Sequence, residues 1–401
     1  MMRILMALMM MVVTVQAQVT VSRNFLKKGF AVTGFGGDAS VAGQVAGVLK
    51  NDLHLSGYFE IKPAAEADYV QQGNVRVQGG MDYVDCMVTL KASNKVILSK
   101  TYQGSAQDLR RVTHQITDDI VQAIMNQRGI ARTKIAFVLS HGNAKELAVM
   151  DYDGYNARQV TYDKSISVRP RWSPDGHKII YTSYLQTFPD VLEADLYTHQ
   201  RRRVAGYPGL NTGAEFSPDG QTIALTLSKD GNPALYTMNA GGGGLLRLTH
   251  TKGAASSPTW SPDGSEIAYV SDDQGSPQVY VIGRNGGEPQ RLTRSPSYNT
   301  EPNWSHPPAG SDLKPMLAVT SRVGGKFQIG IYDGSGGVVP KVADGADNED
   351  PSWAPDGRHL VFAKTANWRS RLYLLDVVTG DQVELPSIEG GASEPAWGPG
   401  L

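Results

Sequence analysis

Acidic side chains recur at one position of an internal repeat, directly before a proline that stands two residues ahead of an aromatic residue. Glu301, Asp350 and Glu394 occupy this position, and Glu349 precedes Asp350. Carboxylate oxygens suit calcium, so a cation site is one interpretation. We favour a solvated rim over a metal site, because exposed acids commonly have no ligand. A docking surface for a basic or polar segment of a partner protein remains open.

In all six copies of the repeat, the residues four and three positions before the aromatic residue form an equivalent pair. We expect each pair to lie just before the innermost strand of a propeller blade, where the six pairs would ring one mouth of the central channel. The pairs are Val168-Arg169, Thr212-Gly213, Ser256-Ser257, Thr300-Glu301, Glu349-Asp350 and Ser393-Glu394.

No catalytic signature accompanies these residues. The chain has no Gly-x-Ser-x-Gly elbow, no His-Glu-x-x-His and no cysteine cluster, which argues against a peptidase and a zinc site. His177 and His359 follow turn glycines closely, where we expect solvated side chains. The alternative function is a secreted metal-dependent propeller enzyme, of lyase or lactonase type, that uses the mouth carboxylates. Such a site would need a histidine at the rim, and none of the eight lies there.

The repeat that positions these pairs has a regular length. Its aromatic residue falls at Trp172, Phe216, Trp260, Trp304, Trp353 and Trp397, which gives spacings of 44, 44, 44, 49 and 44 residues. Ser-Pro-Asp-Gly then suits a tight turn, because proline fixes φ and glycine accepts the left-handed conformation. The strand after the turn is apolar on both faces, as in a blade stacked between neighbours. A period near 44 predicts a propeller of four-stranded blades.

The two ends of the repeat array predict how the ring closes. The array starts at Lys134 with a second strand, and it ends at Ser393–Leu401 with a first strand. Together these fragments make one blade, so we expect six blades, with the C-terminal strand completing the first. This closure leaves no long free edge.

An α+β domain is expected before the propeller. A strand at Phe30–Phe35 and a helix at Ala39–Ser56 are followed by strand-like runs at Tyr58–Ile61, Tyr69–Val77, Tyr83–Leu90 and Lys95–Tyr102, and then by a helix from about Gln107 to Gln127. Ser105 with Asp108 resembles a cap for the second helix. Gly36-Gly37-Asp38 lacks a complete phosphate-binding pattern, so we expect a plain strand-to-helix turn there.

Composition and the N-terminus suggest an exported protein. Lys plus Arg number 38 against 39 Asp plus Glu, which provides no basic field for nucleic acid. Residues 1–17 resemble a signal peptide, with Arg3, a short apolar run and a small-residue cleavage site. We expect domains at 18–130 and 131–401, no membrane span after signal removal, no cofactor, a monomer and a periplasmic location. The single cysteine, Cys86, should be a buried hydrophobic residue.

These features together resemble the TolB family. The likeness includes the Trp-Ser-Pro-Asp-Gly repeats, the stretch Asp-Tyr-Asp-Gly-Tyr-Asn at 151–156 and the ending at 396–401. It implies a non-enzymatic scaffold of the Tol-Pal system that supports outer-membrane invagination during cell division and envelope integrity. It also implies the lipoprotein Pal as a partner at the channel mouth, and TolA as a second partner through the N-terminal segment Gln18–Lys28. Positions matching the Pal-facing loops are Asn211, Thr212, Gly213 and Ser256, followed by the other mouth residues.

Overall fold

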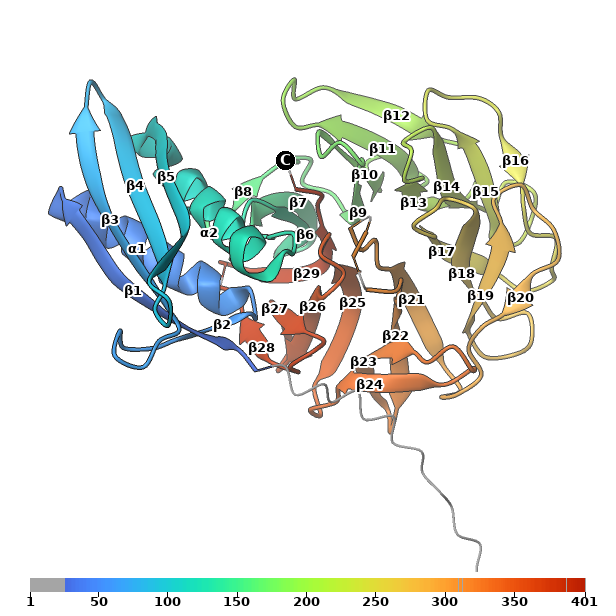
Figure 1. The fold of residues 1–401 in the computed structure, drawn as a ribbon. Helices are drawn as coiled ribbons and strands as arrows, with labels where there is room; N and C mark the ends of the chain where they lie inside the picture. Colours follow the sequence, from blue (N-terminus) through green and yellow to red (C-terminus); the bar gives the residue numbers. More distant parts are fainter. Residues whose placement is uncertain (1–25, 309, 312, 387, 401) are drawn as a thin grey trace, which may run out of the picture.

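Residues 26–308, 310–311, 313–386 and 388–400 are described by the computed structural model (Figure 1). The predicted signal peptide and most of the segment Gln18–Lys28 lie outside this range. The described chain forms an α+β domain followed by a six-bladed β-propeller, as the repeat length and the two half-blades predicted.

The first domain is a five-stranded sheet with two helices. The strands lie in the order β2-β1-β3-β4-β5, with β1 parallel to both of its neighbours. Their bounds are β1 Lys28–Gly37, β2 Phe59–Ile61, β3 Tyr69–Gln78, β4 Met81–Leu90 and β5 Lys95–Ser105. The helices α1 (Ala39–Leu55) and α2 (Leu109–Met125) bury their apolar stripes against the sheet. Cys86 lies in this core and is buried, as predicted.

The two helix starts differ from each other. Asp38 caps α1, because one of its side-chain oxygens accepts the N–H groups of Ser40 and Val41. This is an ordinary strand-to-helix turn. The cap predicted for the second helix is wrong: Ser105 donates to Asp108 at 2.7 Å, but neither side chain caps a helix. A short 3₁₀ turn, η1 (Ala106–Asp108), occupies that position, so α2 begins at Leu109, later than expected.

The propeller contains six four-stranded sheets, which we number as blades 1 to 6. Blade 1 contains β29 (Gly391–Trp397), β6 (Lys134–His141), β7 (Ala144–Asp151) and β8 (Arg158–Gln159). Blade 2 contains β9 (Ser167–Trp172), β10 (Lys178–Ser183), β11 (Asp190–Asp195) and β12 (Arg201–Ala205). Blade 3 contains β13 (Asn211–Phe216), β14 (Thr222–Leu227), β15 (Ala234–Asn239) and β16 (Leu246–Arg247).

The other three blades repeat this order. Blade 4 contains β17 (Ala255–Trp260), β18 (Glu266–Ser271), β19 (Gln278–Gly283) and β20 (Gln290–Arg291). Blade 5 contains β21 (Asn299–Trp304), β22 (Leu317–Val323), β23 (Lys326–Tyr332) and β24 (Val338–Val342). Blade 6 contains β25 (Asp347–Trp353), β26 (His359–Ala366), β27 (Arg369–Asp376) and β28 (Gln382–Glu384).

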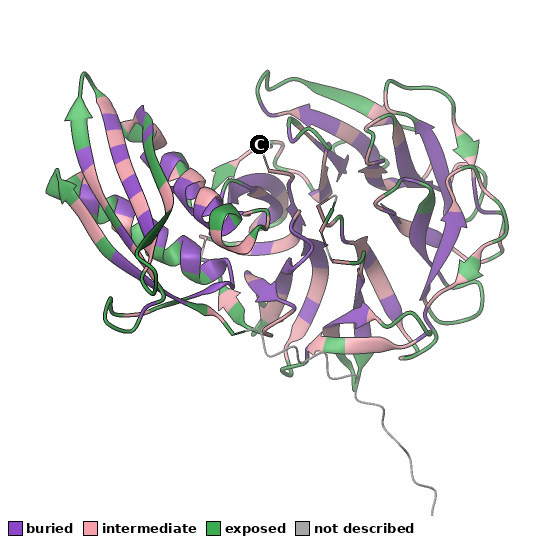
Figure 2. Cartoon of the chain, viewed as in Figure 1, coloured by how far each residue is buried: buried purple, intermediate pink, exposed green. Residues whose placement is uncertain are grey.

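Burial follows the position of each strand within its blade (Figure 2). The second strands, such as β10, β14 and β18, are buried on both faces between neighbouring blades. The outer strands carry more exposed residues, as in β12. The inner strands contact one another in a closed ring around the channel, and β29 pairs with β6 to complete blade 1. The C-terminal strand therefore closes the ring, as predicted.

The repeated aromatic residues join neighbouring blades. The indole N–H of Trp260 donates to the carbonyl oxygen of Glu215 in the preceding blade at 3.1 Å. Trp353 donates in the same way to Asn303 at 3.0 Å, and Trp172 donates to Ala396 at 2.9 Å. The third of these bonds spans the point where the ring closes. A largely buried indole N–H needs such a partner, and these three tryptophans find it in the backbone of the neighbouring blade.

Candidate functional site

One residue of every inner strand has the left-handed backbone conformation. These residues are Arg169, Gly213, Ser257, Glu301, Asp350 and Glu394, with φ between 47° and 61°. At each of them the pairing with the second strand shifts, so that two inner-strand residues face one partner. This is a β-bulge, which redirects side chains where it occurs. The predicted pairs therefore lie inside the inner strands, and not just before them.

The bulges bring side chains from different blades together around the channel, and we call the surface formed by the six pairs the mouth. The backbone N–H of Arg169 donates to the carboxylate of Glu394 at 2.8 Å. Its guanidinium reaches Ser257 Oγ, two blades away, at 3.2 Å. On the other side, the N–H of Asp350 donates to the carboxylate of Glu301 at 3.0 Å. Residues separated by up to 225 positions in the sequence thus form one surface.

The mouth holds four carboxylates on three adjacent blades, and Arg169 is the cation among its paired positions. Burial and the neighbouring Glu301 raise the pKa of Glu349 to about 7. Burial, Glu301 and Glu394 also raise the pKa of Asp350, although Arg169 opposes the shift. Crowded carboxylates repel one another, so positive charge arriving from outside would stabilise them. The mouth is suited to bind a cationic or basic group.

The structure does not bring the Asn211 side chain to this surface. Asn211 is fully buried at the start of β13. Its oxygen accepts the N–H of Tyr207 at 2.9 Å, and its amide nitrogen donates to the carbonyl oxygens of Tyr207 and Pro189. Asn211 therefore holds the neighbouring loops in place and has no free polar atom for a partner. The other eleven predicted residues are all partly exposed, and they are Arg169, Thr212, Gly213, Ser256, Ser257, Thr300, Glu301, Glu349, Asp350, Ser393 and Glu394.

An exposed apolar loop beside the mouth escaped the sequence analysis. Tyr184, Leu185 and Phe188, between β10 and β11, are 43, 51 and 57% exposed. The loop leaves from Ser183, which pairs with Ser167 two residues before Arg169, so it stands at the mouth end of blade 2. Three large apolar residues in a loop of polar surroundings were the signal that could have revealed it.

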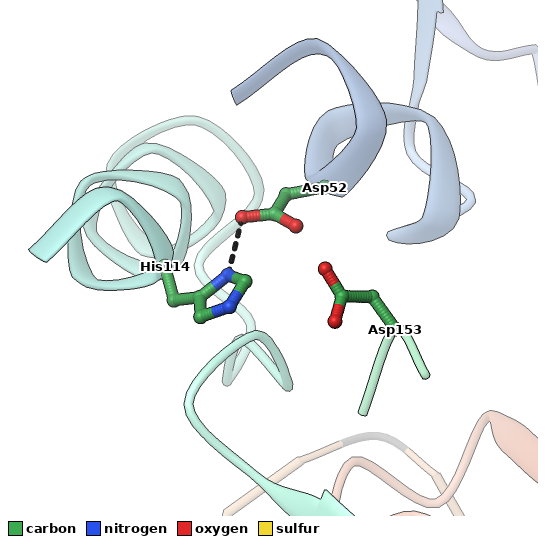
Figure 3. Close-up of side chains that lie close together, drawn as sticks. All are labelled: Asp52, His114 and Asp153. Atoms are coloured by element: carbon green, nitrogen blue, oxygen red, sulfur yellow. Dashed lines mark hydrogen bonds and ion pairs between the residues drawn. The ribbon is translucent and has the colours of Figure 1, made fainter. Parts of the chain in front are cut away.

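A second cluster of chemically active groups lies between the first domain and blade 1 (Figure 3). Asp52 from α1, His114 from α2 and Asp153 from the turn after β7 are all buried, and their ligand-type atoms lie within 4.8 Å of one another. Among the described residues, the mouth carboxylates do not converge this closely. The oxygens of Asp52 already accept bonds from His114, Thr117 and Tyr152, and Asp153 is paired with Arg110. The contacts of the cluster are therefore those of a buried network of hydrogen bonds and ion pairs.

Blade 6 makes a second contact with the first domain. Arg358 pairs with Asp376 at 2.6 Å and donates to the carbonyl oxygen of Gly57 at 3.0 Å. The neighbouring His359 is buried and bonded to Asp356 at 2.6 Å. The prediction that His359 is solvated is wrong, because the first domain and blade 6 pack around its turn. His177 is exposed, in agreement with the prediction.

Comparison with known proteins decides the family. A family model described as the TolB beta propeller domain matches residues 121–401. The chain belongs to the TolB family. Family membership indicates a non-enzymatic protein, which decides against the lyase or lactonase alternative.

Individual TolB relatives agree with this assignment. The Tol-Pal system protein TolB of Alcanivorax borkumensis is 31% identical, over 50% of this chain and 52% of the relative. The protein of the same name from Desulfosudis oleivorans is 30% identical, over 49% of this chain and 44% of the relative. The chain thus spans about half the length of the curated relatives it matches. The crystal structure of TolB from Acinetobacter baumannii superposes with a TM-score of 0.84 at 27% identity, covering 93% of this chain and 97% of that one.

The whole-chain superposition shows that both domains of the TolB fold are present. In the described part of the chain, helices long and apolar enough to cross a membrane are absent.

Proposed function

We propose that this chain is a periplasmic scaffold of the Tol-Pal system and that its channel mouth binds the lipoprotein Pal. The observation that carries the proposal is the convergence of six bulged inner-strand pairs on one surface with an excess of carboxylates. The names of the curated relatives support the assignment to the Tol-Pal system.

The chemistry of the mouth suits a protein partner. Its carboxylates attract a basic side chain, and the apolar loop Tyr184–Phe188 beside it offers surface that a partner would cover. Interfaces combine apolar anchors with charges that orient the partner. We expect Pal to contact Arg169, Gly213, Ser256, Ser257, Thr300, Glu301, Glu349, Asp350, Ser393 and Glu394, with Thr212 at the edge.

Location and a second partner are parts of the same proposal. The predicted signal peptide at residues 1–17 supports export to the periplasm. TolA is the candidate partner for the segment Gln18–Lys28. In this scheme the chain links outer-membrane invagination to cell division and supports envelope integrity.

A matched pair of variants tests Pal binding at the mouth. Ser256→Trp places a bulky side chain on half-exposed mouth surface, whereas Ser265→Trp places the same side chain at the exposed turn between β17 and β18, at the other end of blade 4. The partner is the soluble domain of Pal from the same organism. We expect Ser256→Trp to weaken its binding by about tenfold or more and Ser265→Trp to leave it unchanged.

Two outcomes would contradict the proposal. Equal affinity of both variants would move the Pal site away from the mouth. No binding of Pal to the unmodified protein, with residues 18–401 intact, would remove Pal as the partner altogether.

A further inference from the structure

The cluster between the first domain and blade 1 has a feature unrelated to partner binding, which is a buried histidine between two aspartates of different domains (Figure 3). His114 Nδ1 lies 2.7 Å from a carboxylate oxygen of Asp52, and both residues belong to the first domain. Tyr152 and Asp153 come from the propeller, and the Tyr152 hydroxyl donates to Asp52 at 2.8 Å. The His114 side chain is 3% exposed, and those of Asp52 and Asp153 are fully buried.

The proton positions on His114 follow from its partners. Asp52 can only accept when ionised, so Nδ1 carries a proton. The other ring nitrogen, Nε2, is buried and has no hydrogen-bond partner among the described residues. If His114 were neutral, the lone pair of Nε2 would lie in a buried pocket shared with the Asp153 carboxylate. A second proton on Nε2 replaces that repulsion between acceptors with attraction.

Counting the charges around His114 leads to the same conclusion. From the other faces of the cluster, Asp151 is paired with Lys134 at 2.6 Å and Asp118 with Arg132 at 2.8 Å, so these two acids are already compensated. Tyr152 is neutral, because burial raises its pKa well above the ordinary value. The remaining charges are Asp52 and Asp153 against Arg110, which pairs with Asp153 and stacks on Tyr155 at 3.9 Å. Burial is the main cause that raises the pKa of Asp153, and the charges of His114 and Arg110 oppose this shift. With both acids ionised, two buried acids and one base balance when His114 is also positive.

We propose that protonated His114 fastens the first domain to blade 1, and that loss of this proton loosens the contact between the two domains. An unbalanced buried charge is costly, so the separated arrangement, which returns water to Asp153 and Arg110, becomes more favourable when His114 is neutral. The junction is then a pH-sensitive latch built into the fold. This inference does not depend on the identity of any partner.

The direction of the pH effect follows from the balance of effects on His114. Burial lowers its pKa, but the hydrogen bond and charge of Asp52, together with the charge of Asp153, outweigh burial and raise the pKa above its ordinary value. A histidine whose pKa is raised on docking stabilises the docked state. This stabilisation is fully present when the pH is below about 6.5, the unperturbed pKa of histidine. The stabilisation is lost as the pH rises through the raised pKa of the docked state. The latch is therefore closed in mildly acidic solution and loosens in alkaline solution.

Hydrogen exchange of the chain from residue 18 tests the latch. Protection of the backbone amides at 152–156, corrected for the intrinsic effect of pH, is compared at about pH 6 and about pH 8.5. We expect on the order of tenfold faster exchange at the higher pH in the unmodified protein. His114→Gln should show no such pH dependence. His54→Gln is the matched control, because His54 is exposed on α1 two residues from Asp52 and should behave like the unmodified protein.

A second variant keeps the test decisive if His114→Gln does not fold. Asp153→Asn leaves Asp52 and Arg110 in balance with a neutral His114, so it should also abolish the pH dependence. In the same variant the pKa of His114, followed by its ring proton resonances, should fall by about one unit. Equal protection at both pH values in the unmodified protein would overturn the proposal, as would an unchanged His114 pKa in Asp153→Asn.

Discussion

At the residue scale, the mouth combines two features that individually destabilise a fold. Five of the six left-handed positions carry a side chain, and only Gly213 avoids the steric cost of that conformation. Like charges also gather there, as the raised pKa values of Glu349 and Asp350 indicate. A surface optimised for stability alone would use glycine and neutral side chains. The arrangement is consistent with a surface kept for binding.

The raised pKa of Glu349 predicts a pH-dependent loss of stability. A carboxyl whose pKa rises from 4.5 to about 7 on folding binds more protons in the folded state across this interval. Stability contributed by the protonated form is therefore lost as the pH rises from about 4.5 through about 7. Glu349→Gln should reduce this loss, measured as the midpoint of denaturant unfolding across the interval. Glu266→Gln serves as the control, because Glu266 is an exposed acid next to the turn between β17 and β18, away from the mouth. Identical pH profiles for the unmodified protein and Glu349→Gln would show that Glu349 does not titrate in this range.

At the element scale, the bulge in each inner strand and the loop that follows each second strand together build the mouth. The bulge sets where the polar pairs lie, because it interrupts the pairing at the same point in all six blades. The loop between β10 and β11 carries three exposed apolar side chains, and the equivalent turn of blade 6, between β26 and β27, carries the exposed Trp368. The loop and the bulged pair of blade 2 are adjacent, so one partner can cover both.

Removing the apolar loop surface should weaken Pal binding without unfolding the propeller. We expect the double variant Leu185→Ser and Phe188→Ser to lose at least about tenfold in affinity, because buried apolar side chains dominate most interfaces. Its melting temperature should hardly change, since both side chains are more than half exposed. Tyr197→Ser is a control, because Tyr197 is 61% exposed beyond the other end of β11. Calorimetry that finds equal Pal affinity for the double variant and the control would exclude the loop from the interface.

At the scale of the whole molecule, the first domain contacts both the first and the last blade of the propeller. Blade 1 holds it through the His114 cluster, and blade 6 holds it through Arg358 on Gly57. These two blades are neighbours across the closure made by β29, so the first domain also bridges that closure. Ring stability and domain docking are therefore coupled.

A pair of glycine substitutions measures the blade 6 contact. Gly57 has φ +72°, and a Cβ there would lie 2.3 Å from Asp376 Oδ2 and 2.9 Å from an Arg358 nitrogen. We expect Gly57→Ala to lower the free energy of unfolding by about 1–3 kcal/mol. Gly47→Ala, within α1, meets no atom within 4 Å and should be neutral or stabilising by about 0.5–1 kcal/mol. A Gly57→Ala protein as stable as the unmodified one in thermal unfolding would show that this contact adds little.

Local sequence alone determined the repeating architecture. Turn residues and doubly apolar strands act over a few positions, so the 44-residue period, the six blades and the closing strand could be predicted from the residues themselves. The same period placed the six predicted pairs at equivalent positions of the ring, but it placed them before the inner strands, whereas the bulges lie inside those strands. The predicted cap of the second helix was wrong, because a 3₁₀ turn lies between Ser105 and the start of α2.

Only the tertiary structure decided which side chains are available and which are occupied. The sequence predicted Asn211 as a polar mouth residue, but its side chain is enclosed by the loops that contain Tyr207 and Pro189. His359 reads as a turn residue in solvent, but the first domain covers its turn. Asp52 meets His114 across 62 positions and Tyr152 across 100, and no local pattern records those distances. Burial and charge pairing depend on packing between elements that are far apart in the sequence, so they arise only when the chain has folded.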